Sequence, residues 1–352
     1  MTCSPSPKAP VVRILTLLGA ALASLSASSG ATPVRLANGS LEAIVTPRFG
    51  GRGLHLSLEG RANLFRIGEA VASETEPRVD AFADNIPYFG HTVWLGPQSE
   101  WWAHQDIHPA RREARAPWPP DPWLNQAPTA IVEESPRHLV LEGTASPLAG
   151  VRLRKGFVLG EGEAANTVHH WAEAENVSDA PVAWDLWFNT RVAPGGHVYV
   201  PVSDTAGLRF TAFGDPTRAD LETRIEGGLL SLLHHPLPPD LVGRKGKVAL
   251  QPAAGWMAYF DEGQVLLIEF PHEPAEAMHP EQGQVELYLD WEADDPTAGI
   301  LELEVHAPYR TLAPGGSMRA AETWRVLLYD GPATSSAHHA FLRQTLSKSP
   351  SP

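Results

Sequence analysis

The sequence predicts an all-β protein, built as one large antiparallel sandwich. Proline is abundant, with 33 residues in a chain of 352, and each proline ends or excludes a helix locally. Short runs rich in β-branched and aromatic residues recur between Gly, Pro, Asn and Asp, at the spacing typical of sandwich strands. No repeat of fixed period and no Gly/Ser linker divides the chain between residues 33 and 335. We therefore expect a single domain over 33–335.

The N-terminal residues have the order of charged, apolar and small residues that a secretory signal peptide requires. Lys8 and Arg13 precede an apolar stretch at 14–25, and small residues follow it as far as Ala31. As a helix, the apolar stretch would span only ~18 Å, short of the ~30 Å hydrocarbon core of a bilayer. We therefore expect residues 1–31 to be a cleaved signal peptide. The mature chain is then expected to be periplasmic or secreted, with no integral membrane span.

Composition narrows the classes of ligand and partner. The formal net charge is -14, which leaves no basic face to neutralise a phosphate backbone or an anionic membrane. We expect no nucleic-acid partner, and a ligand that is neutral or cationic. Cys3 is the single cysteine and would be lost with the signal peptide. Neither a disulfide nor a cysteine-bound metal is therefore expected.

Fourteen runs after residue 33 have the composition of strands, and turn residues separate them. In chain order these runs are 41–46, 54–58, 131–133, 138–142, 151–159, 167–175, 182–188, 198–202, 248–250, 256–261, 264–270, 284–291, 300–306 and 320–329. Beyond them, a short helix is expected within 333–346. The C-terminal tail, 336–352, ends in Ser-Pro residues that we expect to fray.

Two of these runs differ in how their apolar residues are placed. The run 264–270 is apolar almost throughout, which is typical of a strand buried on both sides. The run 300–306 alternates instead, so that its apolar residues take one face and Glu302, Glu304 and His306 take the other. That polar face is either solvated or part of a site.

Three segments carry the motifs of a known superfamily. Residues 38–58 (NGSLEAIVTPRFGGRGLHLSL) contain a strand that ends in proline, then a Gly-Gly turn and a second strand. Residues 167–191 (TVHHWAEAENVSDAPVAWDLWFNTR) place an Asn-x-Ser-Asp turn between two long strands. Residues 299–316, followed by Trp324, place an acidic strand before Leu-x-Pro-Gly and a final strand. In this order the three segments resemble the galactose mutarotase-like proteins.

The resemblance carries expectations about fold and ligand. It implies a large antiparallel supersandwich that usually binds carbohydrate. The block 96–123, with GPQSEWW and PPDPW, is more similar to exported bacterial members of unknown function than to true aldose 1-epimerases. Carbohydrate is therefore the expected partner.

The resemblance also implies catalytic roles. In the resembling mutarotases, a carboxylate on the strand matching 300–306 takes the proton of the anomeric hydroxyl, and a histidine protonates the ring oxygen. Glu302 or Glu304 matches the base, with His306 next along the same face. Simple exposure of these residues on an edge strand remains the alternative.

The family's histidine is missing where the motif would place it. The matching stretch, 184–189, reads WDLWFN and contains no histidine. Asp185 could act as the acid if burial raised its pKa, and His306 is the other candidate. Without a histidine at this position, the residues favour carbohydrate binding over epimerase activity.

Tryptophans gather between residues 94 and 123. Indole rings stack on the C–H faces of sugars, and neighbouring amides and carboxylates can hold paired hydroxyls. We interpret the rings either as a binding surface or as packing between a loop and the sandwich. The candidate binding residues are Trp94, Gln98, Glu100, Trp101, Trp102, Asp121 and Trp123, and, on the strand of Asp185, Trp187, Asn189 and Arg191; Trp118, Asn125 and Gln126 lie among them.

No motif in the sequence predicts a metal or a cofactor. His104 and His108 have the i, i+4 spacing of a zinc pair, but no HExxH pattern follows and Pro109 limits a helix. The acidic residues at 290–295 lack the Gly and Glu spacing of an EF-hand loop. GxSxG, Walker A and strand-linked GxGxxG motifs are missing from the sequence. We expect neither a cofactor nor a metal.

Three hypotheses for function follow. The first is an exported protein that binds a neutral carbohydrate. The second is an aldose 1-epimerase or another carbohydrate-active enzyme, with Glu302 or Glu304 as the general base. The third is a periplasmic protein-interaction module that uses the indoles as a contact patch.

Overall fold

The computed structural model describes residues 32–203, 207–295 and 297–347, and these residues form two large sheets. The first sheet has eleven strands. In order across the sheet they are β1 (Val34–Ala37), β2 (Leu41–Thr46), β3 (Arg52–Leu58), β4 (His91–Gly96), β9 (Val182–Val192), β19 (Gly299–His306), β18 (Val285–Glu292), β15 (Gly243–Leu250) and β11 (Arg209–Thr211), with β12 (Arg218–Asp220) beside β15 and β20 (Arg310–Leu312) beside β9.

The second sheet has ten strands. They follow one another as β13 (Glu222–Glu226), β14 (Leu229–Leu233), β10 (His197–Pro201), β16 (Trp256–Asp261), β17 (Gln264–Glu269), β21 (Ser317–Leu328), β8 (Thr167–Asn176), β7 (Val151–Leu159), β6 (His138–Glu142) and β5 (Ala130–Ser135). Short helices connect the strands: α1 (Ala70–Ser73), α2 (Pro109–Glu113), α3 (Pro122–Asn125) and the 3-10 turns η1 (Gln98–Glu100), η2 (Gly162–Ala164) and η3 (Ala275–Ala277). The longer helix α4 (Ser335–Leu346) follows the last strand, β21.

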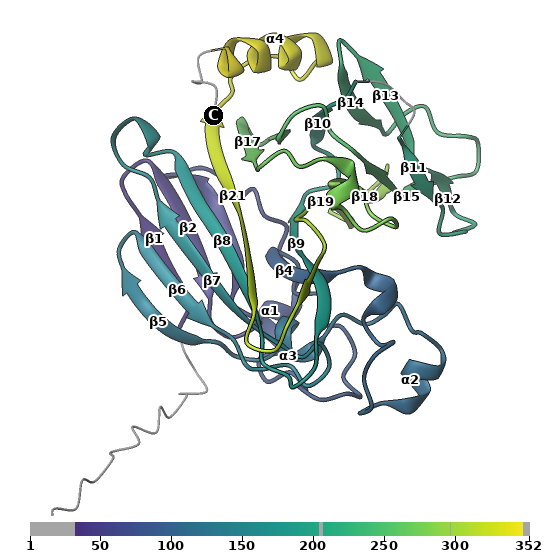
Figure 1. Cartoon of the computed structure of the whole chain (residues 1–352). Coiled ribbons are helices and arrows are strands. Elements are labelled where there is room, and N and C mark those ends of the chain that lie inside the picture. The colour runs from purple at the N-terminus through teal and green to yellow at the C-terminus, as the bar shows by residue number, and fades with distance from the viewer. Residues whose placement is uncertain (1–31, 204–206, 296, 348–352) are drawn as a thin grey trace, which may run out of the picture.

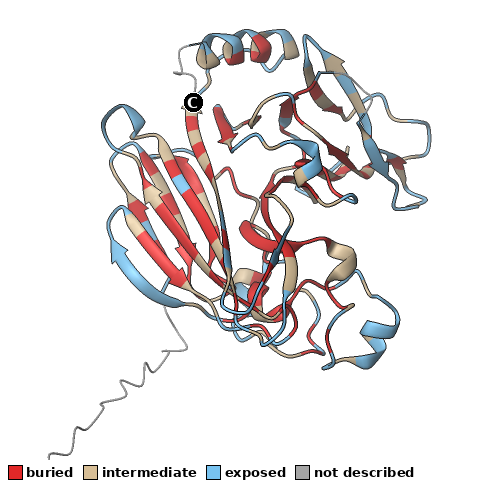
Figure 2. Cartoon of the chain, in the orientation of Figure 1, coloured by how far each residue is buried: buried red, intermediate tan, exposed pale blue. Residues whose placement is uncertain are grey.

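The two sheets pack face to face. In Figure 1, β5 to β8 lie in front of β1 to β3, and α4 lies across the top of the molecule near β17. Burial follows this arrangement: the inner strands are buried, whereas β5 and α2 are exposed (Figure 2). Among the described strand pairs, β12 with β15 is parallel and the others are antiparallel. The all-β sandwich expected from the sequence is confirmed, apart from this one parallel pair.

Strand β17 shows why its sequence is apolar almost throughout. Leu266 and Ile268 face the core between the sheets, whereas Val265 and Leu267 belong to a second cluster that includes Leu342 of α4. Both faces of the strand are therefore covered, and the prediction of burial on both sides is confirmed. The C-terminal helix expected within 333–346 is also confirmed, and it packs onto the outer face of the ten-stranded sheet.

All fourteen expected runs coincide with or overlap observed strands. Strands β1, β4, β11 to β14 and β20 were not expected. The β4 sequence, HTVWLG, is buried at every residue and does not alternate. Its neighbours in the sequence are rich in proline and glycine, which hid the strand. Trp94 therefore lies on a central strand and not in a loop.

Two expectations concern residues outside the described ones. The expected signal peptide, 1–31, and the last residues of the tail, 348–352, lie there. Within the described ranges, no helix has both the length and the apolar character needed to cross a bilayer.

Candidate functional site

The site forms on the outer face of the eleven-stranded sheet, where its central strands bring polar side chains into adjacent rows. Glu304 on β19 lies opposite Asn189 on β9 and Glu286 on β18. One row further, Glu302 lies opposite Arg191 and Tyr288, and Tyr288 lies opposite Lys247 on β15. Side chains two residues apart share a face, so these rows are neighbours. Glu302 and Glu304 therefore lie on a central strand, and the alternative of an edge strand is wrong.

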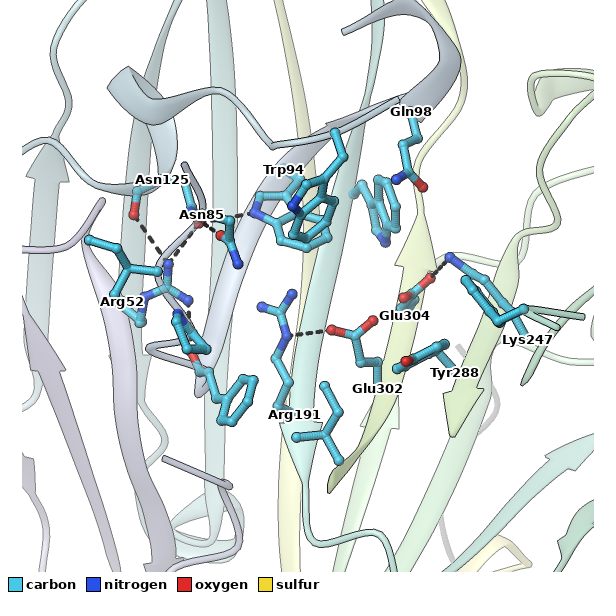
Figure 3. A pocket seen from close by; sticks show the side chains of 17 residues that line it. Arg52, Asn85, Trp94, Gln98, Asn125, Arg191, Lys247, Tyr288, Glu302 and Glu304 are labelled. Atoms are coloured by element: carbon cyan, nitrogen blue, oxygen red, sulfur yellow. Dashed lines mark hydrogen bonds and ion pairs between the residues drawn. The ribbon is translucent and has the colours of Figure 1, made fainter. Parts of the chain in front are cut away.

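A cavity of about 310 Å³ lies over these rows. Figure 3 shows its side chains converging from the sheet and from the segments that cover it. The segment between β4 and β5 supplies part of the cover. The lining residues are Arg52, Asn85, Ile86, Pro87, Phe89, Trp94, Gln98, Trp118, Asn125, Trp187, Arg191, Phe213, Lys247, Tyr288, Ile300, Glu302 and Glu304.

Two cations neutralise the carboxylates of the cavity wall. The Arg191 Nε donates to Glu302 Oε1 at 2.7 Å. The Lys247 Nζ lies 2.7 Å from a carboxylate oxygen of Glu286 and 2.7 Å from one of Glu304. Both cations also contact indole rings: the Arg191 Cζ lies 4.4 Å from the ring centre of Trp94, and the Lys247 Nζ lies over Trp187. Charged groups and rings thus hold one another in place.

The pKa values of the two neighbouring glutamates shift in opposite directions. Burial acts to raise the pKa of Glu302, but the charges of Arg191 and Lys247 outweigh it and hold the pKa below its usual value. For Glu304, burial raises the pKa well above its usual value. Lys247 opposes this rise, and the charges of Glu302 and Glu286 reinforce it. The wall therefore places a carboxyl group whose pKa is lowered beside one whose pKa is raised.

His306 and Asp185 form a second layer next to the wall. The His306 Nδ1 lies 3.2 Å from Asp185 Oδ1 and 2.9 Å from Gln282 Nε2. The His306 Nε2 is 3.8 Å from Glu286 Oε1. Both residues are fully buried, and neither lines the cavity. The structure therefore brings His306 and Asp185 together, as two candidate acids, with His306 one row along the strand face from Glu304 and outside the cavity lining.

Several buried polar atoms on this face lack a hydrogen-bond partner. They include the Trp187 Nε1, the Asn189 Oδ1 and the His306 Nε2. Buried polar groups in native proteins are nearly always paired, and exceptions call for an explanation. The Trp187 ring lines the cavity, and its Nε1 is buried within the wall.

The tryptophan block divides between the cavity and the protein interior. Trp94 lines the cavity, and Trp118 lies at its edge with 47% of its surface exposed. Trp101 is buried between Trp94 and Trp187, and its Nε1 donates to a backbone carbonyl. Trp102 is fully buried, and its Nε1 donates to the Pro119 carbonyl at 2.7 Å. The block is thus part binding wall and part packing, and it exposes no continuous indole patch.

The polar candidates of this block also divide. Gln98 lines the cavity. Glu100 instead pairs with Arg115 at 2.9 Å and with His104. Asp121 caps α3 by accepting from the Trp123 backbone N–H at 2.9 Å. Glu100, Asp121 and Trp123 are therefore not among the lining residues.

Arg52 and Lys247 are lining residues that sequence reasoning missed. Arg52 follows the Gly-Gly turn, where Gly50 has a φ of 70° and an added Cβ would lie 2.4 Å from the Leu124 carbonyl oxygen. Glycine thus lets the turn pack closely against α3, and this brings Arg52 to Asn125. For Lys247, the available signal was alternation across 243–250, of which only 248–250 was expected as a strand.

One group of described residues has the composition of a metal site. Glu286, Glu304 and His306 offer ligand atoms that all lie within 4.8 Å of one another. The Lys247 ammonium already bridges the two carboxylates of this group. A divalent ion would have to displace it, so these residues do not fit a resident metal. His104 contacts Glu100 and His108 caps α2, so these two histidines have separate roles.

The architecture defines the class of protein: the fold is that of the galactose mutarotase-like proteins. A galactose mutarotase-like protein from Lactobacillus casei ATCC 334 aligns over 84% of this chain and 100% of its own, with a TM-score of 0.55 and 11% identity. The Slr1438 protein from Synechocystis sp. PCC 6803 aligns over 84% and 96%, with a TM-score of 0.53 and 13% identity. At these identities the likeness concerns the fold.

The chain belongs to the family described as a domain of unknown function, DUF4380, whose model matches residues 32–327. No curated protein sequence matches this chain. A TPR-domain containing protein from Parabacteroides distasonis ATCC 8503 shares the fold over 85% of this chain and 47% of its own, with a TM-score of 0.50 and 12% identity. The resemblance stated from the three sequence segments is thus confirmed.

Proposed function

We propose that this protein binds a carbohydrate in the cavity over β9, β19, β18 and β15. The observation that carries the proposal is the cavity lining, in which the rings of Trp94, Trp118 and Trp187 stand beside amides and charged groups. Indole rings offer flat apolar surfaces to the C–H faces of a sugar. Asn85, Gln98 and the charged residues can donate to and accept from its hydroxyls. The cavity volume of about 310 Å³ is at the lower end for small-molecule sites and suits one or two sugar rings.

Saturation-transfer NMR with a panel of reducing sugars tests binding directly. The matched variants are Trp118→Ala, which removes a ring at the cavity edge, and Phe82→Ala, which removes an exposed ring that does not line the cavity. Trp118→Ala is expected to weaken binding about tenfold, the loss of one stacking contact. Phe82→Ala is expected to leave it unchanged. Absence of saturation transfer from every sugar and oligosaccharide would overturn the proposal.

The opposite pKa shifts of Glu302 and Glu304 favour a second candidate function, epimerisation at the anomeric carbon. In this reaction Glu302 takes the proton of the anomeric hydroxyl while Glu304 gives its proton to the ring oxygen. The bond between the anomeric carbon and the ring oxygen breaks, and the open-chain aldehyde forms. Rotation and reversal of these steps give the other anomer, and both protons return.

Magnetisation exchange between α and β anomers distinguishes catalysis from binding. An epimerase would accelerate the exchange, and both Glu302→Gln and Glu304→Gln would abolish the acceleration. Saturation transfer without accelerated exchange would leave a binding protein. Unchanged turnover in the two variants would eliminate these glutamates as the acid and base.

We further propose that the protein acts outside the cytoplasm. The support is the order of charged, apolar and small residues over 1–31. Mass spectrometry of the protein from a periplasmic or extracellular fraction would detect a chain that begins near residue 32. Recovery of the uncleaved chain in the cytoplasm would contradict the proposal.

A further inference from the structure

Arg52 is a buried cation without a carboxylate partner in the described part of the chain. Its Nη1 donates to the Phe89 carbonyl at 2.7 Å. Its Nη2 donates to the carbonyl and the side-chain oxygen of Asn125, at 3.1 and 2.7 Å. These partners are neutral, and the Nε has none. Arg52 is 2% exposed and yet lines the cavity.

The surroundings disfavour this charge. Burial, followed by the charge of Arg191, lowers the pKa of Arg52 to about 9. An uncompensated buried charge costs free energy, and proteins usually pair it. Within the described residues, the partner that would offset the charge of Arg52 is therefore missing from the wall.

Among the residues that line the cavity, three cations (Arg52, Arg191 and Lys247) face two carboxyl groups (Glu302 and Glu304). Arg191 pairs with Glu302, and Lys247 is shared by Glu286 and Glu304. Arg52 is left over. Because the pKa of Glu304 is raised, its carboxyl group adds less negative charge to the cavity wall. The cavity is thus locally positive in a chain whose formal net charge is -14.

Arg191 carries hydrogen-bond donors that are not used by Glu302. Its Nε is used by Glu302, and its terminal nitrogens have no hydrogen-bond partner among the described residues. Figure 3 shows these nitrogens directed toward Trp94 and away from Glu302, in the space between Arg52 and Glu302. Guanidinium groups bind carboxylates and phosphates through two parallel hydrogen bonds, which suits them to an anion at this point.

We propose that the carbohydrate bound by this protein carries an anionic group, held between Arg52 and Arg191. This inference rests on the proposed function and names the class of its ligand: a sugar acid, or a sugar ester with the same negative charge. It departs from the neutral ligand expected from the overall charge, because the surface carries the net charge whereas Arg52, Arg191 and Lys247 define the field inside the cavity. The sugar ring then lies toward Trp187 and the glutamates.

Matched pairs of sugars test the inference on the unmodified protein. Calorimetry would compare glucose, galactose and mannose with their uronic acids and their 6-phosphates. At least one anionic sugar is expected to bind ten times or more tightly than its parent, and to weaken as salt is added. Preference for uronates would identify a carboxylate, and preference for phosphates would identify a phosphate ester. Binding of neutral sugars as tight as that of both anionic forms would overturn the inference and leave the proposed function intact, whereas binding of no sugar would overturn both.

Two variants locate the anion. Arg52→Met removes the guanidinium group and keeps an unbranched apolar stem, and Arg35→Met removes an exposed arginine on β1 that does not line the cavity. Arg52→Met is expected to reduce the ratio of the affinities for the anionic sugar and its neutral parent about tenfold or more. Arg35→Met is expected to change neither. If Arg52→Met fails to fold, Arg52→Lys replaces it. The unmodified protein then supplies the second test: a preference for the anionic sugar that does not change with salt concentration would contradict the proposal.

Discussion

Two clusters of buried ionisable side chains lie on opposite faces of the eleven-stranded sheet, and they handle their charge differently. At the cavity wall, Arg191 and Lys247 lie 2.7 Å from carboxylate oxygens of Glu302, Glu286 and Glu304. Between the sheets, Lys155 donates to the Gly50 carbonyl at 2.7 Å, and Trp324 donates to Glu322 at 2.6 Å. The partners there are mainly neutral.

The pKa values record this difference. Between the sheets, burial lowers the pKa of His170 to about 3 and that of Lys155 to about 7, and it raises that of Glu322 to about 8. His170 and Glu322 are therefore neutral near pH 7, and Lys155 is partly so. At the cavity wall, opposite charges hold the pKa of Glu302 below its usual value. A buried group without an opposite charge nearby is held in its neutral form by hydrogen bonds. A buried group beside an opposite charge can stay ionised and act on a ligand.

The largest expected effect is the loss of stability when Lys247, the cation shared by Glu286 and Glu304, is removed. Lys247→Met leaves the buried carboxylate of Glu286 beside Glu304 without a positive partner, and should lower the free energy of unfolding at pH 7 by about 3–5 kcal/mol. Urea denaturation measures this change. The deficit should shrink as acid protonates the carboxylates.

The control for Lys247 is a lysine on the same strand. Lys245→Met removes a cation that pairs with Asp290 at 2.9 Å and is partly exposed, so a loss within about 1 kcal/mol is expected. Equal losses in the two variants would show that the two buried clusters do not differ in the way proposed.

The second prediction concerns the neutral cluster and its pH dependence. The pKa of Glu322 is raised from 4.5 to about 8 in the folded protein. The folded protein therefore holds a proton that the unfolded chain loses, and this contribution to stability is complete below about pH 4.5 and lost as the pH rises through 8. Glu322→Gln should remove a decline of about 3 kcal/mol between pH 5 and pH 8.

Urea denaturation across this pH range, with the exposed Glu134→Gln as control, would check the slope. A variant that declines with pH as steeply as the unmodified protein would show that Glu322 is ionised when folded. The two clusters would then handle charge alike.

The smallest expected effect is the difference in stability between variants of the two glutamates of β19. Glu302→Gln removes the negative charge beside the buried Arg191 but keeps an oxygen that accepts from its Nε, and should cost about 2 kcal/mol. Glu304→Gln replaces a protonated carboxyl group by an amide of similar shape and should cost less than about 1 kcal/mol. Thermal and urea unfolding at pH 7 compare the pair. The reverse order of losses would place the proton on Glu302.

Parts of the site could be predicted because they follow from local pattern. The polar face of 300–306 follows from alternation within one strand, and the structure places Glu302 and Glu304 together on that face. Trp94 and Gln98 were identified by composition and line the cavity. Trp102 was identified by the same signal but is buried, because composition does not show which ring a loop turns inward.

Other parts depend on contacts between segments far apart in the sequence. Arg52 and Lys247 carry no motif of their own, and they become lining residues because β3 and β15 join the sheet that contains β9 and β19. Strand β4 is buried and does not alternate, so its pattern resembles that of a loop rich in apolar residues.

The sequence by itself determined the all-β fold, the positions of fourteen strands and the placement of two glutamates on one strand face. These features depend on side-chain periodicity and turn residues, which act over a few positions. The tertiary structure decided which of the glutamates keeps its proton, which cations face them and which rings reach the cavity. The reason is that desolvation and charge interactions depend on what covers each group, and strands from distant parts of the chain provide that cover.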